Sequence, residues 1–234
     1  MYPTEHLAVR PSRPLWRSGL IGVLLVLAGA SANARHHQDR ADMQADSGRF
    51  DYYVLSLSWA PTYCLTHQDD GAECSGRGYG FVLHGLWPQY EAGGYPENCQ
   101  AQFQLSAAAA AKGRTLYPSE QLMRHEWKEH GTCSGLDALS YFKAADRSTA
   151  VVRIPTPLEA PRTDRSLTAT QVLDLFREAN PQMPDGSMTV ACSRGDLAEI
   201  RVCLTRDLLL RSCGRGVRTT CPHGPVTLPA SRGR

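Results

Sequence analysis

Two short segments of the chain combine histidine with residues that support proton transfer. One segment contains His84, followed by Trp87, and the other contains His125, Glu126 and His130. Histidine is the side chain that can both donate and accept a proton near neutral pH. Two histidines on opposite sides of a phosphodiester could therefore act as base and acid in one transfer reaction, with a hydroxyl group of the substrate as the nucleophile.

The two segments differ in how strongly each one alone indicates a site. His84 closes a β-rich run, where a packed histidine beside a core tryptophan is the more common interpretation. In the second segment, Glu126 and His130 are four residues apart and share one helix face. His125 lies about 140° from His130 around that helix, near enough to border the same cleft. A solvated charged face is the alternative interpretation of this second segment.

A metal site is a poorer interpretation of the same residues. His125 and Glu126 begin like the zinc motif H-E-x-x-H, which needs two histidines at i and i+4. Here the fourth position after His125 is Glu129, and the next histidine is His130. The chain also has no C-x-x-C pair, although zinc ligands in one chain segment usually sit two to four residues apart. The sequence therefore predicts no metal and no other cofactor.

Strands and helices of mixed order must position these residues. Alternating apolar residues predict strands, and Ser, Thr and Gly beside periodic runs predict the limits of helices. The expected strands are 51–59, 79–84, 187–192 and 197–205, with Gly85 and Pro88 ending the second one. The expected helices are 107–111, 119–130, 136–145 and 169–179, with a loop at 153–165. Because strands and helices do not alternate strictly, the pattern favours an α+β fold.

The beginning of the chain has the pattern of a secretory signal. Arg10, Arg13 and Arg17 precede an apolar run at 19–30 and small residues up to Ala34, the order typical of a cleaved signal peptide. A membrane anchor is the weaker alternative, because a span needs roughly 20 apolar residues. We expect a signal peptide at 1–34, a flexible leader at 35–48, one catalytic domain at 49–222 and a flexible tail at 223–234.

The overall charge gives no support for nucleic-acid binding. The formal net charge of the 234 residues is +2. The first 34 residues carry three arginines and one glutamate, so the remaining chain has as many acidic as basic side chains. Any affinity for a polyanion must therefore come from a local site rather than from bulk charge.

The cysteines agree with export to an oxidising compartment. All eight follow the expected signal peptide: Cys64, Cys74, Cys99, Cys133, Cys192, Cys203, Cys213 and Cys221. An even number of cysteines in a short exported chain indicates a disulfide framework. Eight cysteines allow 105 pairings, and their spacing alone does not choose among them.

The two histidine segments resemble the paired active-site signatures of the ribonuclease T2 family. Phe81–Gln89 is similar to the first signature and His125–Ser134 to the second, and the resemblance extends over roughly residues 50–221. It implies an antiparallel sheet flanked by helices in a single disulfide-rich α+β domain. It also implies cleavage of single-stranded RNA with low base specificity, through a 2′,3′-cyclic phosphate to a 3′-phosphate.

The resemblance implies a role for each residue of the two signatures. His130 corresponds to the general base and His84 to the general acid. His125 corresponds to a residue that holds the phosphate, and Glu126 to one that supports the transition state. The implied disulfides are Cys99–Cys133, Cys192–Cys221 and Cys203–Cys213, which leaves Cys64–Cys74.

Substrate binding is implied for three further residues, and one position departs from the family. Trp87 is expected to stack on a base, since every base has a π-face, and Tyr95 and Gln89 are expected to join it. Relatives often have Asp at the position of Gln89, which leaves base preference open. The family usually has Lys where this chain has Glu129, and we expect this carboxylate to repel the transition state. Lys128 is expected to point away from the helix face of Glu126.

Three classes of function compete for this sequence. The first is an active, secreted or periplasmic ribonuclease, and the second is a binding protein on the same fold that has lost catalysis. The presence of both His84 and His130 favours the first class. A hydrolase of another kind is disfavoured, because no G-x-S-x-G motif is present. The expected partner is RNA rather than DNA, with no stable membrane association after signal removal and no obligate protein partner.

Overall fold

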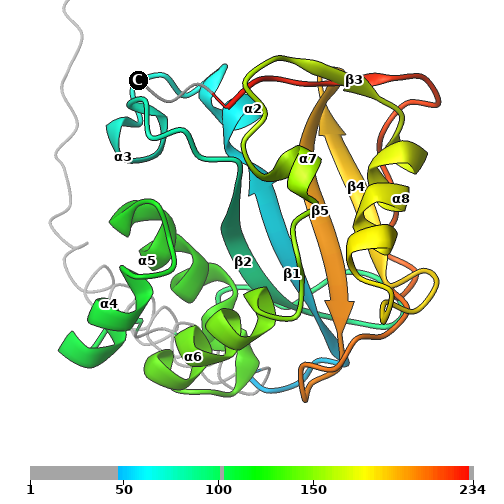
Figure 1. Ribbon diagram of the computed structural model, residues 1–234. Helices are drawn as coiled ribbons and strands as arrows, with labels where there is room; N and C mark the ends of the chain where they lie inside the picture. The colour runs from blue at the N-terminus through cyan, green and yellow to red at the C-terminus, as the bar shows by residue number, and fades with distance from the viewer. Residues whose placement is uncertain (1–46, 101–102, 232–234) are drawn as a thin grey trace, which may run out of the picture. The chain divides into compact units, whose positions relative to one another are not determined.

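A six-stranded sheet organises the chain. The computed structural model describes residues 47–100 and 103–231. The strands are β1 (Tyr52–Trp59), β2 (Phe81–Gln89), β3 (Arg165–Leu167), β4 (Met188–Ser193), β5 (Asp196–Leu204) and β6 (Val226–Leu228). Their order is β2-β1-β5-β6-β3, with β4 also paired to β5, and all pairs but β5·β6 are antiparallel. Helices flank this sheet, so the predicted α+β class is confirmed (Figure 1).

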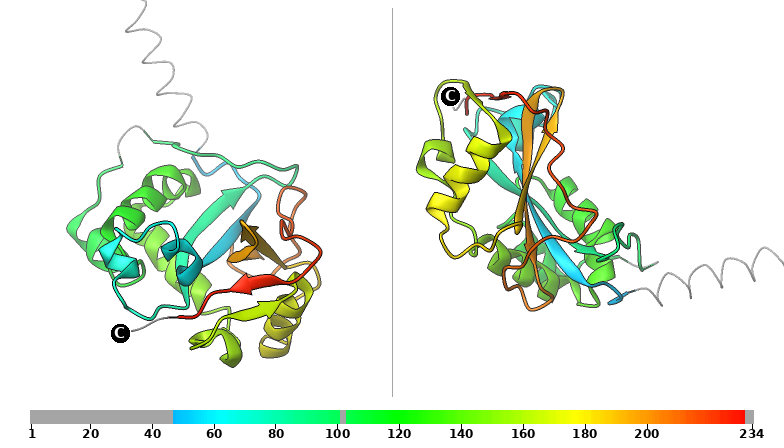
Figure 2. Two further views of the ribbon diagram at one scale, coloured as in Figure 1. Left: turned by 90° about the horizontal axis from the view of Figure 1, so that it is seen from above. Right: turned by 90° about the vertical axis from the view of Figure 1, so that its right-hand side faces the viewer.

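Two groups of helices lie beside different parts of the sheet. Figure 1 shows α4 (Ala107–Gly113), α5 (Glu120–Glu129) and α6 (Ala138–Thr149) gathered beside β2, while α7 (Thr156–Glu159) and α8 (Ala169–Ala179) lie beside β3 and β4. The edge-on view in Figure 2 separates α7 and α8 from the other three helices. The histidines singled out from the sequence, His84, His125 and His130, therefore lie on the side of the domain formed by β2 and α5.

Strand β1 is paired on both edges and covered on both faces. Its side chains alternate between two apolar environments. Tyr53, Leu55 and Leu57 are buried in the main core, which also contains helical residues. On the opposite face, Tyr52 and Val54 pack in a smaller cluster with Cys203. This period of two is the signature of a strand that is covered on both sides.

Strand β2 is longer than the sequence predicts. Gly85 and Pro88 do not end it, and the pairing with β1 continues to Gln89. Proline is tolerated here because β2 is the edge of the sheet. The register changes where Ser56 opposes Gly85 and Leu57 opposes Leu83, which leaves His84 as the extra residue of a β-bulge. Bulges re-aim side chains and are common beside active sites.

The helix limits follow from capping side chains. Ser119 accepts a hydrogen bond from the backbone N–H of Leu122 at the start of α5, and Thr168 forms a capping box with Gln171 at the start of α8. Helix α6 begins two residues later than predicted, at Ala138, because Asp137 is its N-cap. After His130, at the end of α5, the chain enters the 3-10 turn η1 (Gly131–Ser134) rather than a loop.

Sequence patterns missed the shortest elements and one terminal strand. Helices α2 (Ala60–Cys64) and α3 (Gly71–Cys74) follow β1. Helix α7 lies inside the stretch 153–165 that was predicted as a loop, and β3 begins at the last residue of that stretch. The predicted flexible tail is wrong for residues 226–228, which form β6. Val226 and Leu228 are fully buried there, because the strand pairs with both β3 and β5.

Four disulfides hold the loops between these elements. They are Cys64–Cys74, Cys99–Cys133, Cys192–Cys221 and Cys203–Cys213, the pairing that the family resemblance implies. The bond between Cys99 and Cys133 fastens η1, directly after the end of α5. The predicted signal peptide and nearly all of the predicted leader lie outside the described residues. Within the described residues, no helix has the length and apolar character of a membrane span.

Candidate active site

His84 sits in a ring of acidic and basic side chains. Its Nδ1 donates a hydrogen bond of 2.6 Å to Glu199 Oε1 on β5. Its Nε2 lies 3.6 Å from Glu126 Oε1 on α5. Burial lowers the pKa of His84, but the hydrogen bond to Glu199 and the charges of the two carboxylates outweigh it, so the pKa lies above the ordinary value. These contacts therefore favour the charged form of His84.

Glu126 is a fully buried acidic residue of the second signature. Its Oε2 accepts a hydrogen bond of 2.7 Å from Trp87 Nε1. Burial raises the pKa of Glu126 to about 7, although the charge of His84 and the Trp87 hydrogen bond oppose the rise. The carboxyl group lies over Gly85, where a Cβ atom would stand 2.0 Å from Glu126 Oε2. Only glycine at position 85 leaves room for this arrangement.

His130 has the opposite electrostatic environment. It is the C-cap of α5, and its ring lies 5.3 Å from that of Trp87 and 5.9 Å from that of Tyr95. Burial, together with the positive charges of His125 and His84, lowers the pKa of His130 to about 4. Above about pH 4 the neutral form of His130 is therefore favoured, whereas the surroundings of His84 favour its charged form, so the two imidazoles differ in their tendency to hold a proton.

Trp87 lies against both histidines. The centre of its ring lies 5.0 Å from that of His84, in an edge-on contact. The centre of the His130 ring lies 5.3 Å away, in a tilted contact. A pocket of about 320 Å³ is lined by Trp87, Gln89, Tyr95, His130 and others. Tyr95 is half exposed in this pocket, whereas the amide of Gln89 is buried and donates to the carbonyl of Pro88.

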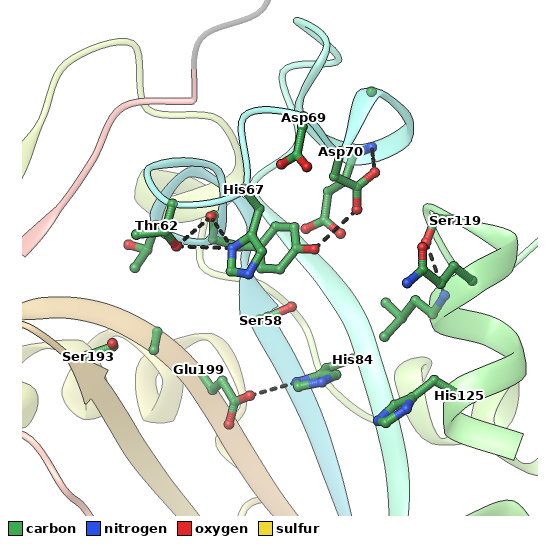
Figure 3. A pocket seen from close by; sticks show the side chains of 17 residues that line it. Ser58, Thr62, His67, Asp69, Asp70, His84, Ser119, His125, Ser193 and Glu199 are labelled. Carbon is green, nitrogen blue, oxygen red and sulfur yellow. Dashed lines mark hydrogen bonds and ion pairs between the residues drawn. The ribbon is translucent and has the colours of Figure 1, made fainter. Parts of the chain in front are cut away.

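A second, larger pocket contains the other two histidines of the signatures. Its volume is about 620 Å³, and His84, His125 and Glu199 are among its lining residues. Figure 3 shows His125 on α5 beside His84, with the hydrogen bond from His84 to Glu199 drawn as a dashed line. The tertiary structure thus brings together His84, His125, Glu126 and His130, which the sequence predicts as a set.

Two charged residues of this site were given no role from the sequence, although their segment is part of the family resemblance. Glu199 and Arg201 are on β5, and Arg201 Nη2 lies 2.6 Å from Glu199 Oε2. The guanidinium also lies 5.6 Å from the centre of the Trp87 ring. The signal in the sequence was an acidic and a basic residue two apart in an otherwise apolar strand, where both side chains point to the same face.

Glu129 has partners that the sequence analysis did not foresee. Lys128 Nζ lies 2.5 Å from Glu129 Oε1, and Asn98 donates its amide to the other carboxylate oxygen. These contacts lower the pKa of Glu129 despite its partial burial, and the charge of His125 acts in the same direction. The negative charge of Glu129 is therefore paired, which weakens the expected repulsion of a transition state.

The site can perform acid–base chemistry with its own side chains. The rings of His84 and His130 both lie against Trp87, and the carboxyl group of Glu126 lies close to both His84 and Trp87. Across residues 47–100 and 103–231, no three His, Cys, Asp or Glu side chains are grouped so that they could hold a metal ion. The arrangement suits proton removal at one atom and proton delivery at another.

Comparison with known proteins places this geometry in a family. The model of the ribonuclease T2 family matches residues 50–213. A ribonuclease of Aeromonas hydrophila is 43% identical over 126 residues, which cover 54% of this chain and 54% of that protein. A probable ribonuclease of Haemophilus influenzae is 24% identical, and the matched part covers 61% of its length. The chain thus spans a little over half of these two relatives.

Solved structures share the fold. The RNase-related protein from Calystegia sepium matches with a TM-score of 0.63 at 21% identity, and the match covers 78% of this chain and 98% of that one. A variant of RNase MC1 in complex with 5′-UMP matches with a TM-score of 0.59 at 24% identity, covering 74% and 96%. The family model spans both histidine segments and most of the sheet, and on that match the chain belongs to the ribonuclease T2 family.

Proposed function

We propose that the chain is an endoribonuclease that cleaves single-stranded RNA by in-line transesterification. His130 takes the proton of the ribose 2′-hydroxyl, and the 2′-oxygen attacks the neighbouring phosphorus. The bond from phosphorus to the 5′-oxygen breaks, and His84 gives its proton to that oxygen. A water molecule then opens the 2′,3′-cyclic phosphate, with the two histidines in exchanged roles, and a 3′-phosphate is the product.

The observation that carries this proposal is the opposite protonation of two histidines around one tryptophan. The pKa of His130 is lowered to about 4 and that of His84 is raised, so at mildly acidic pH the base is neutral and the acid is charged. Pairs of titratable groups whose environments separate their pKa values are typical of acid–base assignments. His125 and Glu126 take supporting roles, His125 in holding the phosphate and Glu126 in stabilising the transition state.

The substrate is proposed to be RNA because the nucleophile is its own 2′-hydroxyl, which DNA lacks. A pocket of about 320 Å³ beside His130 suits one nucleotide, with Trp87 and Tyr95 as stacking surfaces. Similar structures are described as complexes with 5′-UMP and 5′-AMP, which supports nucleotide binding at this fold. We expect low base specificity, because stacking on an aromatic ring does not depend on the hydrogen-bonding groups at the edge of a base.

No metal is required in this proposal, because the histidines make both proton transfers and the substrate supplies the nucleophile. We also propose that the protein is secreted or periplasmic. Four disulfides support this location, since such bonds persist in oxidising compartments. RNA that reaches those compartments is the proposed substrate, and no protein partner is needed for the chemistry.

One assay tests the function and the mechanism together. The protein is incubated with a short single-stranded RNA in EDTA, and the products are followed by ³¹P NMR. The expected result is a transient 2′,3′-cyclic phosphate that converts to a 3′-phosphate, while an RNA with 2′-deoxyribose at the cleavage position stays intact. Cleavage that needs a divalent ion would overturn the mechanism. Binding of RNA without cleavage would favour the alternative of a binding protein on the same fold.

A further inference from the structure

Glu199 contacts Nδ1 of His84, the ring nitrogen that does not face Glu126. The distance from His84 Nδ1 to Glu199 Oε1 is 2.6 Å, while Nε2 at the other end of the ring lies near Glu126. A carboxylate only accepts hydrogen bonds, so Nδ1 carries a proton in this contact. In the neutral state of the ring this leaves Nε2 as the nitrogen that exchanges protons with a substrate.

The fold brings these two side chains together across a third strand. His84 is on β2 and Glu199 on β5, with β1 between them. In β1, Ser56 opposes Gly85 and Arg201, and Ser58 opposes Val82 and Glu199. Serine side chains are short, so they leave space above β1 for two longer side chains to meet. The bulge adds to this effect, because it gives His84 a direction that a regular pairing would not.

Arg201 holds Glu199 in place. Its Nε and Nη2 both contact Glu199 Oε2, at 2.8 and 2.6 Å, which leaves Oε1 for His84. The guanidinium in turn packs over Trp87 at 5.6 Å from the ring centre. Glu199 is only 9% exposed, and a charge-assisted hydrogen bond to such a largely buried carboxylate is strong.

Three carboxyl groups face His84, and they differ in charge at the pH where the enzyme is proposed to work. Burial raises the pKa of Glu126 on α5 and of Glu73 on α3 to about 7 each. The pKa of Glu199 is lowered to about 2, because His84 and Arg201 outweigh its burial. Glu199 is thus the carboxylate that stays charged beside His84 at mildly acidic pH.

Positive groups also face the imidazole. Arg201 on β5 opposes a positive charge on His84. At the end of α5, the charge of His84 in turn lowers the pKa of His130. His125 of α5 lines the same pocket as His84. A charged His84 among these neighbours needs a permanent negative partner in direct contact, and Glu199 provides it.

We propose that Glu199, clamped by Arg201, is a positioning residue for His84. It fixes the Nδ1–H tautomer, turns Nε2 toward the substrate and keeps the ring charged until the leaving oxygen takes the proton. This inference rests on the proposed function for its catalytic meaning, but the coupling between Glu199 and His84 is a property of the protein without substrate.

The direct test is the titration of His84 in the full chain, followed by NMR of its ring protons. Glu199→Gln keeps the shape of the side chain and removes its charge. The midpoint of the His84 titration is expected to fall by about 1–2 pH units, whereas that of His130 rises or stays. An unchanged His84 midpoint in Glu199→Gln would overturn the proposal. Should this variant fail to fold, Glu199→Asp keeps the charge at a longer distance, and a smaller fall is expected.

The chain offers a matched control for this substitution. Glu91 pairs with Arg211 at 2.8 Å, and Arg211 packs over the Tyr52 ring at 4.5 Å, which repeats the acid, arginine and aromatic arrangement away from the histidines. Glu91→Gln is expected to leave the His84 midpoint within the error of the measurement. A fall equal to that of the Glu199 variant would mean that the effect is a general loss of charge, and the proposal would be abandoned.

The kinetic readout separates positioning from simple packing. In Glu199→Gln, the alkaline limb of the kcat/KM profile is expected to move to lower pH by the same amount as the His84 midpoint, while the acid limb stays. KM should change less than threefold and kcat at pH 7 should fall about 10–100-fold. A uniform fall at every pH would contradict the proposal. If the wild-type chain cleaves no RNA but the His84 midpoint still falls, the coupling stands and the proposed function fails.

Discussion

Replacing Gly85 by alanine is expected to disable the site without touching any histidine. A Cβ atom at position 85 would lie 2.0 Å from Glu126 Oε2 and 2.3 Å from Trp87 Nε1, whereas ordinary contact begins near 3.4 Å. Both side chains must therefore move by more than an ångström, and their mutual hydrogen bond of 2.7 Å cannot survive unchanged. Because Glu126 is fully buried, it has no solvent-filled space into which it can withdraw.

The size of the effect follows from this displacement. A shift of about 1 Å in a positioned group costs about 10²-fold in rate, which corresponds to about 2.7 kcal/mol of transition-state stabilisation. Overpacking of a filled site costs about 1–3 kcal/mol of folding stability. For a domain of this size, such a loss lowers Tm by about 2–12 °C. Gly85→Ala is thus expected to stay folded at 25 °C and to lose most of its activity.

The assay measures kcat and KM on a short RNA at a temperature well below the Tm of the variant. Gly224→Ala is the matched control, because nothing lies within 4 Å of a Cβ atom placed at that position, and it should keep wild-type kinetics. A Gly85→Ala protein with wild-type kcat and wild-type Tm would refute the reasoning. It would mean that Glu126 and Trp87 can work from other positions than those of the structure.

Four further predictions concern the proposed mechanism. His84→Ala and His130→Ala should each lower kcat by about 10²–10⁴-fold. His223→Ala, at an exposed position, should leave kcat unchanged, and equal losses in all three variants would contradict the assignment of His84 and His130 as acid and base. The profile of kcat/KM against pH should be bell-shaped. Activity should fall below about pH 4, where His130 becomes protonated, and again at a pH above the ordinary pKa of histidine, where His84 loses its proton. A maximum above pH 8 would contradict these charge states. Trp87→Ala should raise KM and cost about 1–3 kcal/mol of stability, because Glu126 loses a buried donor; a loss of stability with unchanged KM would limit Trp87 to packing. Glu129→Lys should change kcat by no more than about fivefold, since the carboxylate is already paired with Lys128 and ion pairs near the surface contribute about 0.2–1 kcal/mol. A tenfold rise in kcat would mean that Glu129 does repel the transition state, as the sequence suggested.

The parts of the fold that could be predicted are those with local signals. The alternation in β1 and the caps at Ser119 and Thr168 are readable from a few adjacent residues, and the corresponding elements lie where the sequence predicts them. The end of β2 was mispredicted, because Gly85 and Pro88 are strand breakers only inside a sheet. That β2 is an edge strand is a property of the whole topology, and no local pattern reveals it.

The tail was mispredicted for a related reason. Residues after Cys221 are rich in Pro, Gly and Arg, a composition that favours an irregular chain. Val226 and Leu228 nevertheless form β6, because partners from β3 and β5 are available beside them. Three residues with two apolar side chains carry too little information to predict a strand, and burial against distant partners supplies the rest.

The sequence by itself determined which residues could carry the chemistry of this protein. Residue types and their intervals identify the two histidine segments and the acidic residue beside them, and they show that the spacing of a zinc motif is absent. The family resemblance rests on the same residues. Such motifs are readable because their residues are close together in the chain, where helix and strand periods govern which side chains share a face.

The tertiary structure alone decided the protonation states and the partner of His84. Glu199 is 115 residues away from His84, and the contact exists because a central strand with two serines lies between their strands. His84 and His130 are the same residue type, yet a carboxylate contact raises the pKa of one and burial among positive charges lowers that of the other. A pKa depends on burial and on charges within a few ångströms, and these distances are set by packing between segments far apart in the sequence.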